Sequence, residues 1–120
     1  LTFSKSIIYS DSNSNEKAEA GEFIRLSTYI KNTGLSLTSG AKVTIKSNSS
    51  SISGLANYYA LGGYSNVNYG DLSMNQEEFH TGLMFNILAG TPAGTVITFS
   101  VILSDQYGNT WNDSFNLTTQ

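Results

Sequence analysis

Side-chain oxygens recur at regular spacing in one polar stretch near the start of the chain, from Asp11 to Glu22. Calcium loops bind their ion through positions 1, 3, 5, 9 and 12 and through the backbone carbonyl of position 7, which give about six to eight oxygen ligands. Glu22 falls at position 12, where a bidentate carboxylate is usual. The stretch therefore predicts a structural Ca2+ site, with side-chain ligands from Asp11, Asn13, Asn15, Glu19 and Glu22 and the backbone carbonyl of Lys17.

The charges of this loop also favour a cation. Asp11, Glu19 and Glu22 repel one another in so short a segment, and a divalent cation offsets that repulsion. Glu16 stands at position 6, where glycine is usual, and the flanking segments have strand rather than helix patterns, so a true EF-hand is excluded. The alternative is a turn rich in Asn and Ser that needs no ion. If calcium binds, we expect it to join the first two strands.

Catalytic arrangements find little support in the sequence. His80 is the single histidine, and neither a cysteine nor a Gly-x-Ser-x-Gly motif is present for nucleophilic chemistry. Glu77 and Glu78 are adjacent, and adjacent side chains of an extended chain point to opposite faces, which disfavours a glycosidase carboxylate pair. We therefore expect a protein that is not an enzyme.

Aromatic side chains offer a second candidate site, because carbohydrate-binding sandwiches stack sugars on exposed rings. Tyr58, Tyr59 and Tyr64 lie in an irregular, glycine-rich segment, and such loops often carry binding residues. Trp111 is a further candidate, although it lies in phase with Phe115 and core packing is favoured for it. Carbohydrate binding is therefore the alternative function.

Two further acidic residues, Asp105 and Asp113, could contribute to a second ion site. Turn chemistry and solvation at the end of a strand explain them equally well. The sequence leaves these two interpretations open.

Length and composition limit the possible classes. A chain of 120 residues fits one domain, and we expect residues 1–120 to form a single sandwich cut from a larger protein, since the first residue is Leu1. A low charged fraction of 12% and the many Ser, Thr, Asn and Gly residues are typical of β-rich modules of secreted or cell-surface proteins. The net charge of −3 and the scattered basic residues disfavour nucleic-acid binding, and no apolar run suffices to span a membrane.

Apolar and polar residues alternate in short runs, which predicts strands over about residues 2–9, 22–31, 41–45, 82–88, 96–104 and 111–117. Residues 47–76 are less regular and predict loops with short strands. Ile24, Leu26, Thr28 and Ile30 share one face of their strand, and Ala41, Val43 and Ile45 likewise lie on one side of theirs. The residues predicted to face inward are Leu83, Phe85, Ile87, Ile97, Phe99, Val101 and Leu103. About seven strands with frequent turns favour an immunoglobulin-like antiparallel β-sandwich, while a jelly roll or barrel gives similar local patterns.

Several motifs resemble one bacterial module. They are Asp11-x-Asn13-x-Asn15 followed by Gly21-Glu22, then Ile30-Lys31-Asn32-x-Gly34, Tyr69-Gly70-Asp71-Leu72, Thr91-Pro92-Ala93-Gly94-Thr95 and Asp105-x-x-Gly108-Asn109-Thr110-Trp111. Between about residues 9 and 118, the chain resembles the immunoglobulin-like domains that accompany gingipain-type cysteine peptidases and related bacterial adhesion modules. Glu16 and Ala20 depart from the glycine and proline usual in that family.

The resemblance implies an accessory module beside a catalytic or adhesive domain, and it brings no catalytic residue. We therefore expect a non-catalytic accessory or adhesion module of a secreted or surface bacterial protein, stabilised by Ca2+. Its expected partners are neighbouring domains of the same chain, and a glycan or cell-surface protein is a further candidate.

Overall fold

The alternating segments form an all-β structure. The computed structural model describes residues 1–34, 37–57 and 65–120, and these residues contain eight strands and no helix. No segment of the described chain is therefore a helix that could cross a membrane. The strands are β1 (Thr2–Asp11), β2 (Phe23–Lys31), β3 (Thr38–Lys46), β4 (Ile52–Asn57), β5 (Ser65–Leu72), β6 (Glu77–Ile87), β7 (Val96–Ser104) and β8 (Thr110–Thr118).

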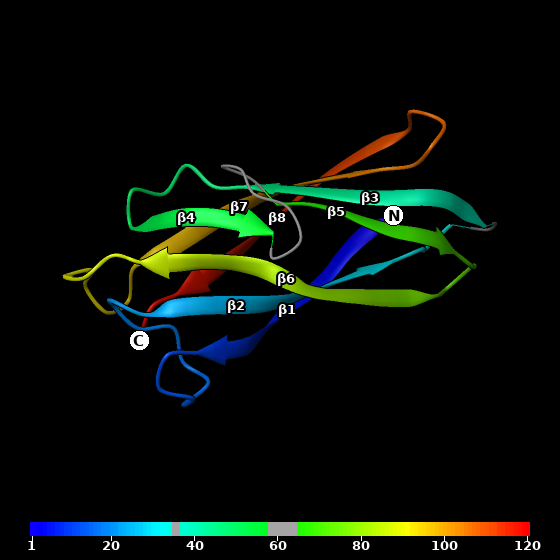
Figure 1. The fold of residues 1–120 in the computed structure, drawn as a ribbon. Coiled ribbons are helices and arrows are strands. Elements are labelled where there is room, and N and C mark those ends of the chain that lie inside the picture. The colour runs from blue at the N-terminus through cyan, green and yellow to red at the C-terminus, as the bar shows by residue number, and fades with distance from the viewer. Residues whose placement is uncertain (35–36, 58–64) are drawn as a thin grey trace.

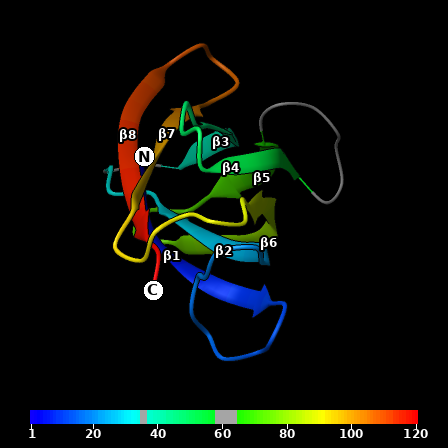
Figure 2. The same cartoon turned by 90° about the vertical axis from the view of Figure 1, so that its left-hand side faces the viewer.

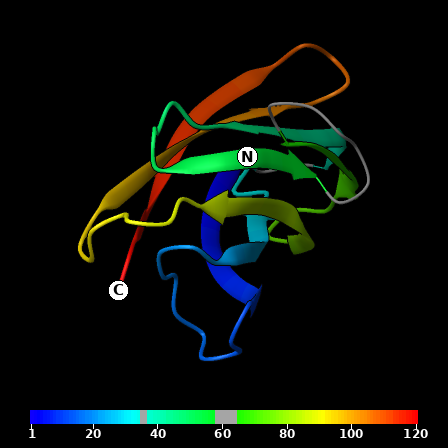
Figure 3. The ribbon, with the colours of Figure 1, turned by 60° about the vertical axis from the view of Figure 1, so that its left-hand side comes forward.

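The strands form two antiparallel sheets packed together as a β-sandwich (Figure 1). One sheet has the order β1-β2-β6-β4 and the other has the order β5-β3-β7-β8. Figure 2 shows the two layers from a view turned by 90°. The connection between β1 and β2, which contains the predicted calcium loop, projects beyond the strands (Figure 3). The C-terminal end of the chain lies near this connection in all three views.

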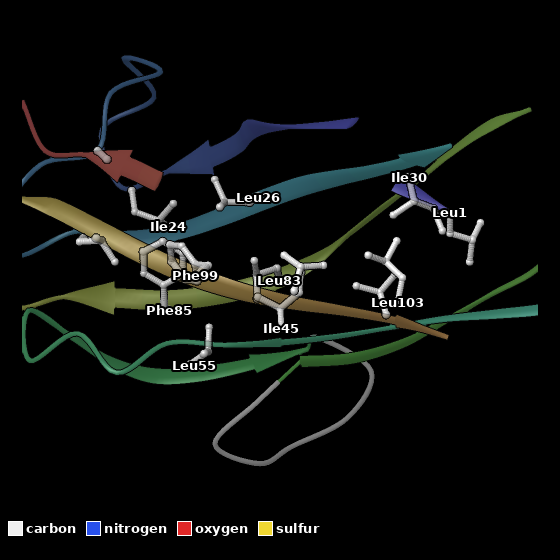
Figure 4. Close-up of a cluster of buried hydrophobic side chains, with 14 of the residues drawn as sticks. Leu1, Ile24, Leu26, Ile30, Ile45, Leu55, Leu83, Phe85, Phe99 and Leu103 are labelled. Carbon is white, nitrogen blue, oxygen red and sulfur yellow. The ribbon is translucent and has the colours of Figure 1, made fainter. Parts of the chain in front are cut away.

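The core lies between the two sheets, and every residue predicted to face inward is buried (Figure 4). Period-2 alternation places these side chains on one face of each strand, where apolar burial stabilises the fold by about 25 cal/mol per Å2. Phe85 of β6 and Phe99 of β7 meet across the core with ring centroids 5.3 Å apart. Trp111 and Phe115 of β8 are half-buried and pack against this core.

Aromatic rings continue this contact toward the first strand. Phe99 stacks on Phe115 at 4.8 Å between centroids, and Phe115 stacks on Phe3 of β1 at 4.7 Å. The four rings therefore form a column, Phe85-Phe99-Phe115-Phe3, that connects strands of both sheets. Offset or tilted ring pairs of this kind contribute about 0.5–1.5 kcal/mol each beyond their buried area.

The prediction of about seven strands is wrong, since the described residues form eight. The irregular region supplies two of them, β4 paired with β6 and β5 paired with β3. Strand β6 also begins at Glu77 rather than near residue 82. Its first residues pair with the end of β2, where Tyr29 stacks on Phe79 with centroids 5.1 Å apart. Because Phe79 is 49% exposed, this segment carries no buried-face pattern that the sequence could reveal.

Candidate metal centre

Asp11 organises the loop that joins β1 to β2. It is the last residue of β1 and is only 9% exposed. Its Oδ1 accepts hydrogen bonds from the backbone N–H groups of Asn13 at 3.2 Å and Asn15 at 3.1 Å. Its Oδ2 accepts one from the N–H of Glu16 at 2.8 Å. One carboxylate thus accepts three backbone N–H groups from the next five residues and holds this segment in a curl.

The following asparagines repeat the same local turn. Asn13 Oδ1 accepts the N–H of Asn15 at 3.2 Å, and Asn15 Oδ1 accepts the N–H of Lys17 at 3.0 Å. Asn side chains favour such bonds to the backbone two residues ahead, and they thereby fix a tight turn. Side-chain oxygens of residues 11, 13 and 15 therefore line one side of the curl.

Glu16 has the left-handed backbone conformation that glycine supplies at position 6 of EF-hand calcium loops. Its φ is 62°, and the φ of Ser14 is 59°. A left-handed backbone costs a non-glycine residue about 1–2 kcal/mol. The bond from the N–H of Glu16 to the Asp11 carboxylate offsets part of this cost, since charge-assisted hydrogen bonds are stronger than neutral ones. The departure at position 6 is therefore compatible with the loop path.

Glu19 faces the two asparagines. Its Oε1 accepts hydrogen bonds from Asn13 Nδ2 at 3.1 Å and from Asn15 Nδ2. The bond from Asn15, and then that from Asn13, lowers the pKa of the Glu19 carboxyl below its ordinary value. The charged form of the Glu19 carboxyl is thus stabilised by the amide NH2 groups of the two asparagines.

Glu22 carries an unpaired buried oxygen. The residue is 6% exposed, and its Oε1 accepts the N–H of Glu19 at 2.9 Å. Its Oε2 is buried with no hydrogen-bond partner among the described residues. A buried carboxylate oxygen without a partner is costly, and a cation is the partner that this donor set fits.

Hydrogen bonds connect the residues of the five predicted side-chain ligands along the loop. Asp11 accepts the backbone N–H groups of Asn13 and Asn15, Glu19 accepts the side-chain amides of the same two residues, and Glu22 accepts the backbone N–H of Glu19. The described residues contain no group of three or more His, Cys, Asp and Glu side chains placed to hold a metal. A calcium loop depends on amide and backbone oxygens as well as carboxylates, and those are the groups that the curl supplies.

Backbone hydrogen bonds connect the second half of the loop, residues 18–22, to the rest of the fold. Gly21 N–H donates to Ile87 O at 2.9 Å, and Ile87 N–H donates to Glu22 O at 2.8 Å, which extends the pairing of β2 with β6. Ala18 is 1% exposed and packs in the core, and its carbonyl accepts the N–H of Gln120 at 2.8 Å. The burial of Ala18 is not among the predictions from the sequence, although an apolar residue within a polar loop is the signal that could have indicated it.

Asp105 stabilises the turn between β7 and β8. Its Oδ1 accepts the N–H groups of Tyr107 at 2.9 Å and Asn109 at 3.0 Å, and its Oδ2 accepts Asn109 Nδ2 at 2.8 Å. The bond from the Asn109 side chain lowers the pKa of this carboxyl. Asp113 is exposed in β8, where its Oδ1 accepts the N–H of Ser114. Turn and strand chemistry therefore accounts for the contacts of both residues.

Trp111 does not contribute to the predicted aromatic platform, because its side chain packs against the core. Tyr58, Tyr59 and Tyr64 lie outside the described residues. The β1-β2-β6-β4 sheet carries other partly exposed rings, and three of them, Tyr9, Tyr29 and Phe79, each have a cationic or aromatic neighbour. Arg25 lies 5.0 Å from the centroid of the Tyr9 ring, and Lys5 lies 4.8 Å from that of Tyr29, which also stacks on Phe79.

The residues weighed for catalysis lie on β6. Glu77 is exposed and its Oε2 accepts a hydrogen bond from Ser4 Oγ at 2.6 Å, whereas Glu78 is half-buried. His80 pairs with Thr28 in the sheet register. A comparison of the chain with protein-family models and with curated proteins finds no match.

Proposed function

We propose that this chain is a non-catalytic, immunoglobulin-like accessory or adhesion module of a secreted or surface bacterial protein, stabilised by Ca2+ bound between β1 and β2. The observation that carries the proposal is the unpaired buried Oε2 of Glu22, at the end of a loop whose other oxygens have calcium-loop spacing. The ion would be held by Asp11, Asn13, Asn15, Glu19, Glu22 and the carbonyl of Lys17.

Strand order supports the immunoglobulin-like part of the proposal. A constant-type domain has its first, second, fifth and fourth strands in one sheet and its third, sixth and seventh strands in the other. The order β1-β2-β6-β4 and the order β3-β7-β8 reproduce this arrangement when β5 is treated as an additional strand. Strand β5 follows β4 and extends the second sheet beside β3. The added strand accounts for the difference from the seven expected.

The calcium ion would have a structural role. The loop connects the edge strand β1 to β2, and Ca2+ would neutralise the carboxylates of Asp11, Glu19 and Glu22 in that loop. A rigid sandwich with this stabilisation suits a spacer that positions neighbouring domains of the same chain, which are the proposed partners. A glycan or a cell-surface protein is a further proposed partner.

Thermal unfolding in calcium and in chelator tests the proposal. We expect saturating Ca2+ to raise the melting temperature, because a ligand at a hundred times its Kd stabilises the native state by about 2.7 kcal/mol. Glu22→Gln should lose most of this increase, since the amide retains one oxygen but removes the bidentate carboxylate. Asp113→Asn is the matched control, with the same loss of charge on an exposed strand. A melting temperature that does not respond to Ca2+ in the unmutated chain would contradict the proposed site.

Carbohydrate binding is the alternative proposal. Because Trp111 packs against the core, it rests on Tyr58, Tyr59 and Tyr64. A glycan array separates the two functions: binding that is lost when the three tyrosines are replaced by alanine favours the alternative, and an array without signal removes it.

A further inference from the structure

The last two residues of the chain connect the end of β8 to two different parts of the fold. Thr119 is 2% exposed and is fixed to the turn before β7. Its N–H donates to Thr95 O at 2.9 Å, its carbonyl accepts the N–H of Gly94 at 2.7 Å, and its hydroxyl donates to Pro92 O at 2.8 Å. The hydroxyl oxygen also accepts the N–H of Thr95 at 3.0 Å. Thr119 therefore belongs to the β5-β3-β7-β8 side of the sandwich.

Gln120 reaches the connection between β1 and β2, two strands of the opposite sheet. Its N–H donates to the carbonyl of Ala18 at 2.8 Å. Ala18 lies between Lys17, whose carbonyl is a proposed calcium ligand, and Glu19, whose carboxylate is another. The buried Ala18 side chain, 1% exposed, anchors this point of the loop to the core. The C-terminal segment thus contacts the loop between two of its proposed ligands.

We infer that Ca2+ binding in the loop of residues 11–22 clamps the C-terminal residue, Gln120, to the β1–β2 connection. This inference rests on the proposed calcium site. An ion bound by the carbonyl of Lys17 and the carboxylate of Glu19 fixes the backbone on both sides of Ala18, and so fixes the acceptor of the Gln120 N–H. Without the ion, repulsion among the carboxylates and the unpaired Oε2 of Glu22 lower the cost of local opening.

The clamp joins the two sheets at one end of the sandwich. On one side is the connection between β1 and β2, and on the other is the end of β8, which lie close together in Figures 1 and 3. In a parent protein whose chain continues past Gln120, the clamp would set the direction in which the chain leaves the sandwich. Calcium would then regulate the orientation of a following domain as well as the stability of this one.

Amide hydrogen exchange of the 120-residue chain tests the clamp residue by residue. We expect saturating Ca2+ to slow exchange of the Gln120 amide by about tenfold relative to chelator. The Thr119 amide is the internal control, because it donates to Thr95 O outside the loop. We expect its rate to change by less than about twofold. Calorimetric titration of the same samples with Ca2+ measures binding separately.

Two variants connect the effect to the loop. Glu22→Gln and the more exposed Glu19→Gln should each abolish the slowing at Gln120, while Asp113→Asn should retain it. Calcium binding without a change at Gln120 overturns the clamp and leaves the proposed site intact. A titration with no binding overturns both. A response that survives in both glutamate variants also overturns the clamp, because the ion would then act from elsewhere.

Discussion

Replacing Asp11 with asparagine removes one of the two carboxylate oxygens around which the predicted calcium loop curls. In the native loop, Oδ1 accepts two N–H groups and Oδ2 accepts the N–H of Glu16. Asparagine can retain the oxygen that faces Asn13 and Asn15, but its NH2 group then faces the N–H of Glu16. The variant therefore loses one charge-assisted hydrogen bond and leaves a donor opposite a donor at a site that is only 9% exposed.

The expected loss of stability follows from these contacts. A hydrogen bond to a charged group contributes about 1.5–3 kcal/mol, and an unsatisfied buried donor adds to the cost, so we expect Asp11→Asn to lower the free energy of unfolding by about 2–3 kcal/mol in chelator. This corresponds to a fall in melting temperature of about 8–12 °C at roughly 4 °C per kcal/mol. Chemical denaturation and thermal melting both measure it.

Asp105→Asn provides a matched control. Asp105 accepts two backbone N–H groups through Oδ1 and the Asn109 side chain through Oδ2, in the same pattern as Asp11, but it lies in a more exposed turn. Solvent can replace the lost bond there, so we expect a clearly smaller loss of stability. Equal losses in the two variants, or a loss below about 0.5 kcal/mol for Asp11→Asn, would refute the view that a buried carboxylate holds the loop.

Three further predictions concern other residues of the fold. Glu16→Gly should raise the free energy of unfolding by about 1 kcal/mol in urea denaturation, because glycine removes the left-handed strain. A loss of stability would contradict this. Asn32→Ala should lower it by about 2–4 kcal/mol, because Asn32 is 1% exposed and binds Leu72 O and the N–H of Gly34. A loss below about 1 kcal/mol would show that water replaces these bonds. The pKa of Glu19 is lowered in the folded state, so its contribution to stability is present above the unfolded pKa of about 4.3 and is lost as pH falls through the folded pKa. Urea denaturation between about pH 3 and 6 should therefore show a shallower fall in stability for Glu19→Gln than for the native chain, and identical profiles would contradict this.

Strands with one buried face were predictable from the sequence. Val96–Ser104 was predicted with the bounds that the structure gives, because Ile97, Phe99, Val101 and Leu103 alternate with exposed residues. The beginning of β6 was missed, since its pairing with β2 depends on exposed aromatic contacts such as Tyr29 with Phe79. Period-2 patterns report burial, and they say little about strands whose side chains remain at the surface.

Hydrogen bonds connect the predicted ligand residues along the loop, whereas their role as ligands and calcium binding itself stay predictions. Spacing indicated Asp11, Asn13 and Asn15 because turns between near neighbours are local. The bond between Gln120 and Ala18 could not be predicted in the same way, because it joins residues from opposite ends of the sequence. The unpaired Oε2 of Glu22 likewise depends on burial by the complete fold.

The column of four aromatic rings has a consequence for the rate of folding. Phe3 and Phe115 stack at 4.7 Å although nearly the whole chain separates them in sequence. Closing so long a loop precedes any gain from the contact, and proteins dominated by such distant pairings fold in about milliseconds to seconds. We therefore expect slow, cooperative folding in which the Phe3–Phe115 pair forms late, so that Phe3→Leu should accelerate unfolding more than it slows refolding.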